Sequence, residues 1–110
     1  MLDRVKFTAA LKAAEAAALA IPIEGDGGDG GSCNFDTPYV TVPKGTRSST
    51  IKECAEAAGV HVSPHYTSAS RWMVHVTTTG QGYRRTKGAE AARDALKANG
   101  FESFVYYAVD

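Results

Sequence analysis

The chain has 110 residues, of which 44% are hydrophobic and 22% are charged, and its formal net charge is zero. This length fits one domain with a core of its own, and the composition is typical of a globular protein and not of a disordered chain. Twelve basic and twelve acidic side chains exclude a nucleic-acid binder that relies on a large positive net charge.

The amino-terminal segment, residues 3–20, predicts a helix because it is rich in alanine and contains no Gly or Pro. Its few large apolar residues are Val5, Phe7, Leu11 and Leu19, so we expect it to bury only a thin stripe. The glycines and acidic residues that follow favour a linker. We therefore predict an N-terminal helix extension at 1–23, a Gly/Asp-rich linker at 24–33 and an α+β core domain at 34–110.

The core domain alternates segments with strand and helix patterns. Strands are predicted at 38–42, 60–66, 71–78 and 101–109, and helices at 48–58 and 86–99. The order βαββαβ indicates a ferredoxin-like, antiparallel sheet with two helices on one face, preceded by the extra N-terminal helix. Right-handed crossovers would place the first and third strands side by side in the centre. An α+β sandwich of another topology stays open.

Capping residues set the expected helix ends. Thr50 with Glu53 three residues later resembles a capping box, with Ser49 as the rival cap, and Gly59 supplies the stop. Thr86 is the expected cap of the last helix.

Strand alternation divides the predicted sheet into two faces. Apolar residues of one parity, such as Val40, Val62, Trp72 and Val74, suit the face under the helices. The opposite face would carry histidines, a cation, a methionine and aromatics: Tyr39, His61, His65, Arg71, Met73, His75, Phe104 and Tyr106. A one-residue shift in the last strand would exchange Tyr106 for Tyr107.

Three interpretations of this second face remain open. An open sheet with aromatics and cations can stack the bases of single-stranded nucleic acid. Tyr, Met, Arg and His are also typical anchors for a protein partner. Alternatively, the N-terminal helix lies across the face and buries it.

A glycine-bearing loop before the last helix is a second candidate site. It comprises Gly80, Gln81, Gly82, Tyr83, Arg84 and Arg85, with Lys87 close behind. Free amides at a helix start and nearby cations attract phosphate groups, although the spacing matches neither a Walker A loop nor GxGxxG. The alternative is a plain connecting loop. Charge favours the first interpretation locally, because residues 44–110 carry a net +3 and residues 1–43 a net −3.

No residue set predicts catalysis or metal binding. His61 and His65 would lie about 13 Å apart on a strand, and Asp26 and Asp29 lack the spacing of an EF-hand. Because no Ser-His-Asp or Cys-His set can be assembled, we expect no enzyme, no cofactor and no metal site. A metal-dependent enzyme that uses His61, His65, His75 or Cys33 is the third hypothesis.

Cysteine use and hydropathy bear on the compartment. Cys33 and Cys54 lack CxxC spacing and are expected to be free thiols. The longest nearly uncharged apolar stretch, residues 16–23, is far shorter than the roughly 20 residues that span a bilayer. We therefore expect no membrane association and a cytoplasmic protein.

Three segments, Cys33-Asn-Phe-Asp36, Gly80-Gln-Gly-Tyr-Arg-Arg-Thr86 and Ala89-Glu-Ala-Ala92, resemble small bacteriophage and prophage accessory proteins. The resemblance covers mainly residues 33–110, and it implies a protein of a mobile element that acts in the cytoplasm of the bacterial host. Such proteins often antagonise host defences, including CRISPR–Cas, by binding.

The leading hypothesis is therefore a small non-enzymatic binding protein that inhibits or modulates a host macromolecule, either a protein or a protein–nucleic acid complex. The alternative is a module that binds single-stranded nucleic acid or a nucleotide through the open face and the Arg84–Lys87 loop. Homodimerisation stays open.

Overall fold

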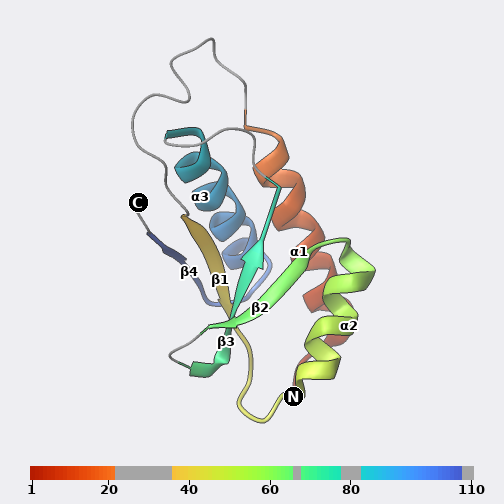
Figure 1. Ribbon diagram of the computed structural model, residues 1–110. Helices are drawn as coiled ribbons and strands as arrows, with labels where there is room; N and C mark the ends of the chain where they lie inside the picture. Colours follow the sequence, from red (N-terminus) through yellow and green to blue (C-terminus); the bar gives the residue numbers. More distant parts are fainter. Residues whose placement is uncertain (22–35, 66–67, 78–82, 108–110) are drawn as a thin grey trace.

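The computed structural model describes residues 1–21, 36–65, 68–77 and 83–107 (Figure 1). In chain order the elements are α1 (Arg4–Leu19), β1 (Thr37–Thr41), α2 (Ser48–Ala58), β2 (His61–His65), β3 (Ser68–His75), α3 (Tyr83–Ala98) and β4 (Ser103–Tyr106). The fold is α+β, with three helices and one open, four-stranded antiparallel sheet. The predicted linker at 24–33 lies outside the described residues.

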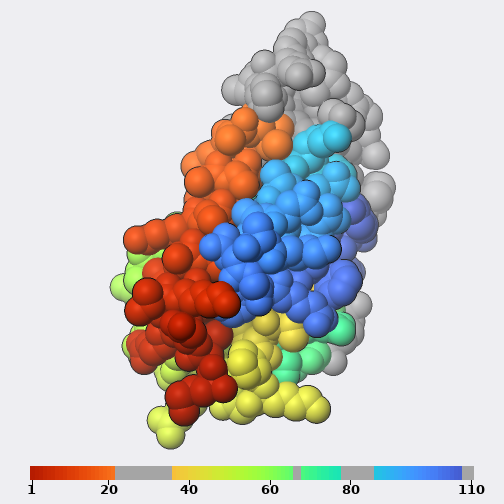
Figure 2. Space-filling model, turned by 180° about the vertical axis from the view of Figure 1, so that it is seen from behind, coloured from red at the N-terminus to blue at the C-terminus, as the bar shows by residue number. Residues whose placement is uncertain are grey.

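The strands are ordered β2-β3-β1-β4, so β1 and β3 are central neighbours, as predicted. The three helices lie on one face of the sheet (Figure 1). Seen from the helical side, α1 and α3 lie side by side (Figure 2). We call the side of the sheet that faces the helices the inner face. Val40, Val62, Trp72 and Val74 occupy it and are buried, which confirms their predicted orientation.

Helix α1 packs into the core through two large apolar residues and several alanines. Phe7 and Leu11 are fully buried, and alanines at positions 10 and 14 are buried beside them. Alanine side chains are short, so they allow α1 to pack closely against the helices on either side of it. The Phe7 ring also meets the Phe101 ring edge-on, with their centroids 5.3 Å apart. The buried residues of α1 are Phe7, Ala10, Leu11, Ala14 and Ala18, which form the single thin stripe that was expected. Through this stripe α1 shares one hydrophobic core with the sheet.

Polar contacts hold α1 at both ends. Its first turn begins at Asp3, whose carboxylate accepts a hydrogen bond from the Lys6 amide at 3.0 Å. Near its other end, the Glu15 carboxylate accepts hydrogen bonds from the Thr77 amide and hydroxyl, at 2.6 and 2.8 Å. Thr77 lies two residues after the end of β3, so this contact joins α1 to the segment that leaves a central strand.

Helix α2 has the predicted bounds but not the predicted cap. Its N-cap is Arg47, and no side chain makes a capping hydrogen bond. Glu53, the expected partner in a capping box, instead pairs with Arg4 of α1 at 2.7 Å. That exposed ion pair raises the pKa of Arg4. Tertiary contact between two helices has thus replaced a local cap.

Helix α3 begins at Tyr83, three residues before the predicted cap Thr86. Thr86 lies inside the helix, and its hydroxyl donates a 2.6 Å hydrogen bond to the carboxylate of Asp36, a buried residue just before β1. A threonine whose hydroxyl binds another segment in this way does not have to be the first residue of the helix, and no Gly or Pro between residues 83 and 86 disfavours an earlier start.

Two further sequence expectations concern membranes and thiols. Within the described ranges, no helix is long and apolar enough to cross a bilayer. Cys54 is buried and is a free thiol, as predicted. Cys33 lies outside the described residues.

Gly59 ends α2 in the left-handed conformation, with φ of 77°. Gly59→Ala should lower the free energy of unfolding by about 1–2 kcal/mol, because a Cβ disfavours this conformation while finding open space around it. Urea unfolding measures the change. Gly59→Asn is the control, since asparagine tolerates the left-handed region better. An alanine variant as stable as the wild type would contradict the assignment of this helix end.

Candidate functional site

The outer face of the sheet, opposite the helices, is the candidate site. Its residues are Tyr39, Thr41, His61, Ser63, His65, Arg71, Met73, His75, Phe104 and Tyr106. None of the helices that the structure describes covers this face, because α1 packs on the inner face beside α2 and α3 (Figure 1). The alternative in which the N-terminal helix buries the outer face is therefore wrong. The physical reason for the position of α1 is the hydrophobic effect, because Phe7 and Leu11 are buried against the larger apolar surface of the inner face.

An aromatic cluster lies at the centre of the outer face, and we use this name for Tyr39, His65, Phe104 and Tyr106. Tyr39 lies between two of its members, with ring centroids 5.8 Å from Phe104 and 5.2 Å from His65. Tyr106 meets His65 edge-on at 5.9 Å. These separations are in the range where aromatic rings attract each other. The cluster spans three strands, β1, β2 and β4.

The register of the strands explains how these rings meet. Tyr39 on β1 is paired with Met73 on one side and Phe104 on the other. The Ser103 hydroxyl donates a 2.7 Å hydrogen bond to the Tyr39 carbonyl, which fastens β4 to β1 beside the cluster. A register irregularity between Pro64 and His65 ends the regular pairing of β2. His65 is only 9% exposed and packs against the neighbouring rings.

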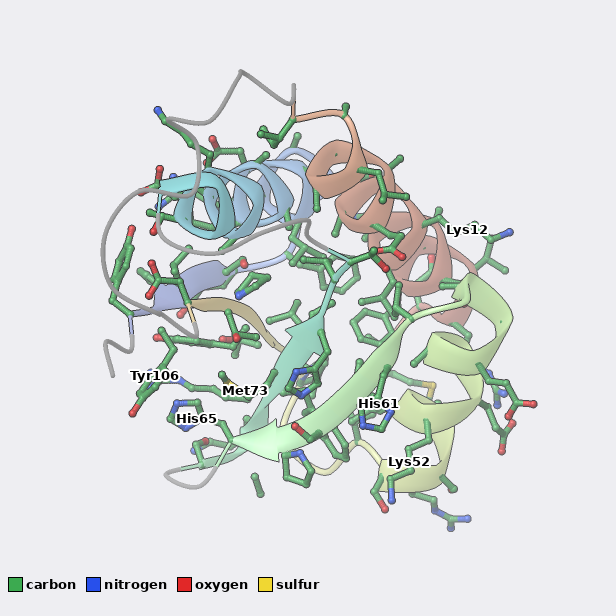
Figure 3. The ribbon with its side chains drawn as sticks, turned by 45° about the horizontal axis from the view of Figure 1, so that its top comes forward. Lys12, Lys52, His61, His65, Met73 and Tyr106 are labelled. Carbon is green, nitrogen blue, oxygen red and sulfur yellow. The ribbon has the colours of Figure 1, made fainter. Side chains whose placement is uncertain are left out.

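One small pocket opens beside the cluster. It has a volume of about 180 Å³ and is lined by Pro64, His65, Met73 and Tyr106. Figure 3 shows His65, Met73 and Tyr106 gathered on the side of the sheet away from α1 and α3. Its lining is almost entirely apolar, so it suits the edge of a planar ring or a methyl group.

The formal charge on the four strands comes from one cation, Arg71. Arg71 places its guanidinium 5.5 Å from the centre of the Tyr39 ring, in a cation–π contact. None of the four strands contains Asp or Glu. Two acidic residues directly precede strands: Asp36 before β1, whose carboxylate accepts a hydrogen bond from Thr86 of α3, and Glu102 before β4, whose carbonyl accepts a hydrogen bond from the Thr41 amide. The face therefore favours an anionic partner over a cationic one.

A second cluster lies on β2 and β3, and we call it the histidine pair. His61 and His75 are direct partners in the register, with ring centroids 5.3 Å apart. The Ser63 hydroxyl lies 2.7 Å from Nε2 of His75. The four-residue spacing in the sequence made His61 and His65 the pair to consider, but the strand register places His61 beside His75. Among the described residues, no group of three or more His, Cys, Asp or Glu side chains could hold a metal ion.

The predicted phosphate loop is described only in part. Gly80, Gln81 and Gly82 lie outside the described residues, whereas the backbone of Tyr83, Arg84 and Arg85 forms the first turn of α3. The prediction that these three residues belong to a loop is wrong. Lys87 is exposed and lies one turn further along the helix.

Three outer-face residues, Thr41, Ser63 and Phe104, were absent from the predicted binding set. Phe104 is 47% exposed and belongs to the aromatic cluster, and Ser63 contacts His75. Alternation along the strands predicted an outward orientation for these residues, but their residue types were not taken as a binding signal. Tyr107, the alternative to Tyr106, lies outside the cluster. Its hydroxyl donates to Glu90 of α3 at 2.9 Å, and this hydrogen bond raises the pKa of Tyr107.

Comparison of the chain with protein-family models, curated proteins and solved structures returns no match. The resemblance to bacteriophage accessory proteins therefore rests on short sequence segments alone, and the function has to be argued from the outer face itself.

Proposed function

We propose that this protein binds single-stranded nucleic acid on the outer face of its sheet. The observation that carries the proposal is the aromatic cluster beside Arg71 on a face that no helix covers. Bases of a single strand are unstacked easily, and their flat faces can pack on tyrosine, phenylalanine and histidine rings.

The electrostatics of the face support the same partner. Backbone phosphates need cations nearby and no competing carboxylates, and the four strands supply Arg71 and three histidines with no acidic residue. Because the net charge of the chain is zero, we expect nucleic acid to be attracted only near these side chains and not to the protein surface as a whole. Affinity should come from stacking with a small number of phosphate contacts, and not from a long basic track.

We also propose that the fold is the ferredoxin-like arrangement, with α1 as an added helix. Its support is the element order after α1 together with the central position of β1 and β3. In such a sheet the two central strands present their outward side chains at the middle of the open face, where Tyr39, Arg71 and Met73 lie.

The test is a fluorescence-anisotropy titration of the full chain with labelled single-stranded RNA, single-stranded DNA and a duplex of the same sequence. Single strands should bind more tightly than the duplex, because duplex bases are not free to stack on the face. Binding should weaken with salt, and a shallow slope is expected because few phosphates are contacted. Equal affinity for all three probes, or no binding at low salt, would contradict the proposal.

The second candidate is a protein partner, in line with the host-antagonist hypothesis from sequence. The observation that favours it is the exposure of Phe104 and Tyr106 on β4, an edge strand with an unpaired side. A pull-down from bacterial lysate, repeated after nuclease treatment, separates the two candidates. A protein that is still captured after nuclease treatment, and is no longer captured by the Phe104→Ala variant, would support a protein partner. A protein that is captured only while nucleic acid is present would support the first proposal.

A further inference from the structure

We propose that the small pocket beside the aromatic cluster takes the methyl-bearing edge of a thymine base, so that the protein prefers thymine to uracil in the strand that it binds. This inference rests on the proposed function, because it names the base that the outer face recognises. The pocket is lined by Pro64, His65, Met73 and Tyr106, and its volume is about 180 Å³.

The pocket lies where a base stacked on the cluster can reach it. His65 and Tyr106 belong both to the lining and to the cluster, with their ring centroids 5.9 Å apart. Met73 is the direct register partner of Tyr39, the ring that contacts both His65 and Phe104. Figure 3 shows Met73 on the same side of the sheet as His65 and Tyr106. The pocket is therefore continuous with the stacking surface and is not a separate hollow.

The size and chemistry of the pocket favour part of a base over a whole nucleotide. Pockets that enclose drug-sized ligands have volumes of roughly 300–1,000 Å³, and this one is smaller. Its lining consists of the Pro64 ring, the Met73 thioether and two aromatic rings, with no Lys, Arg, Asp or Glu among these described residues. A polar edge buried there would lose its hydrogen bonds to water without gaining new ones. A base should therefore enter by an edge that carries no hydrogen-bonding group.

Thymine has such an edge, and a methyl group projects from it. The C5–C6 edge of a pyrimidine has neither donor nor acceptor atoms, and the C5 methyl is the apolar group by which proteins distinguish thymine. Uracil has the same edge without the methyl group, so it fills less of the pocket. Met73 is the residue that we expect to meet the methyl group, because a methionine side chain is flexible and polarisable and adapts to the shape of its neighbour.

The test compares an oligothymidylate with an oligodeoxyuridylate of the same length, since the two single strands differ only in the methyl group. Fluorescence anisotropy with the full chain should give an affinity about fourfold higher for the thymine strand. This factor corresponds to about 0.8 kcal/mol, the contribution of one buried methyl-sized group.

Variants of Met73 separate the pocket from stacking in general. Met73→Ala should bring the ratio of the two affinities close to one, because it removes the surface that meets the methyl group. Met73→Leu should keep the ratio, because leucine preserves the apolar volume. Phe104→Ala is the matched control, since Phe104 belongs to the cluster but does not line the pocket. It should lower both affinities by the same factor and leave their ratio at about four.

NMR of the wild-type chain gives a measurement that needs no variant to fold. Nuclear Overhauser effects should connect the thymine methyl protons with the Met73 methyl group and the Tyr106 ring. Equal affinity for the two strands, or a preference for thymine that survives Met73→Ala, would overturn the thymine pocket and leave single-strand binding in place. Binding of neither strand at low salt would overturn both proposals.

Discussion

Leu11→Ala should lower the free energy of unfolding by about 2–5 kcal/mol, the range found when a fully buried leucine is truncated. Leu11 has no exposed surface and belongs to the core cluster that joins α1 to the sheet. Truncation removes apolar contacts and leaves a cavity between helices that cannot close fully, because they are already packed at short range around alanines. Urea unfolding of the full chain, monitored by the single tryptophan, measures the change.

Leu19→Ala is the matched control, since it makes the same chemical change in the same helix. Leu19 is 55% exposed at the end of α1, so its truncation should change stability by less than about 0.5 kcal/mol. A similar, small effect of both variants would mean that α1 is an appendage to the sheet. A large difference between them would confirm that the whole domain depends on this helix.

Tyr39→Ala should weaken the binding of a single-stranded oligonucleotide by about five- to a hundredfold, because one stacked base contributes about 1–3 kcal/mol. Tyr39 contacts two other rings of the cluster, His65 and Phe104, and its ring also makes the cation–π contact with Arg71. Fluorescence anisotropy at fixed, low salt measures the change. The circular dichroism spectrum of the variant has to match that of the wild type.

Two further variants distinguish stacking from a general loss of structure. Phe104→Ala removes a half-exposed ring on an edge strand, so it should weaken binding with little effect on folding. Arg71→Ala should weaken binding to all sequences alike and reduce the salt slope by about one, as expected for one phosphate contact.

Tyr107→Ala is the matched control for Tyr39→Ala. It removes another tyrosine, 55% exposed, whose hydroxyl contacts α3 and not the outer face. Its affinity should equal that of the wild type. Equal losses in the Tyr39 and Tyr107 variants would argue against the outer face as the binding surface.

Local patterns predicted much of the fold. The bounds of α2 and its end at Gly59 follow from residues within one or two turns of each other, as does the inward orientation of Val62 and Trp72. The outer-face residues were also identified in this way, because alternation along a strand is a property of the strand itself. The predicted helix boundaries were less accurate where a residue contacts a segment distant in the sequence, as Thr86 of α3 contacts Asp36.

The amino-acid sequence by itself therefore determined the elements, their order and the chemical character of each strand face. Tertiary structure alone decided that α1 lies between the other two helices on the inner face, so that none of the described helices lies over the aromatic cluster. It also decided that His61 meets His75 and not His65. The physical reason is the same in both cases. Burial of apolar surface and strand register join residues far apart in the chain, and neither leaves a periodic signal in the sequence.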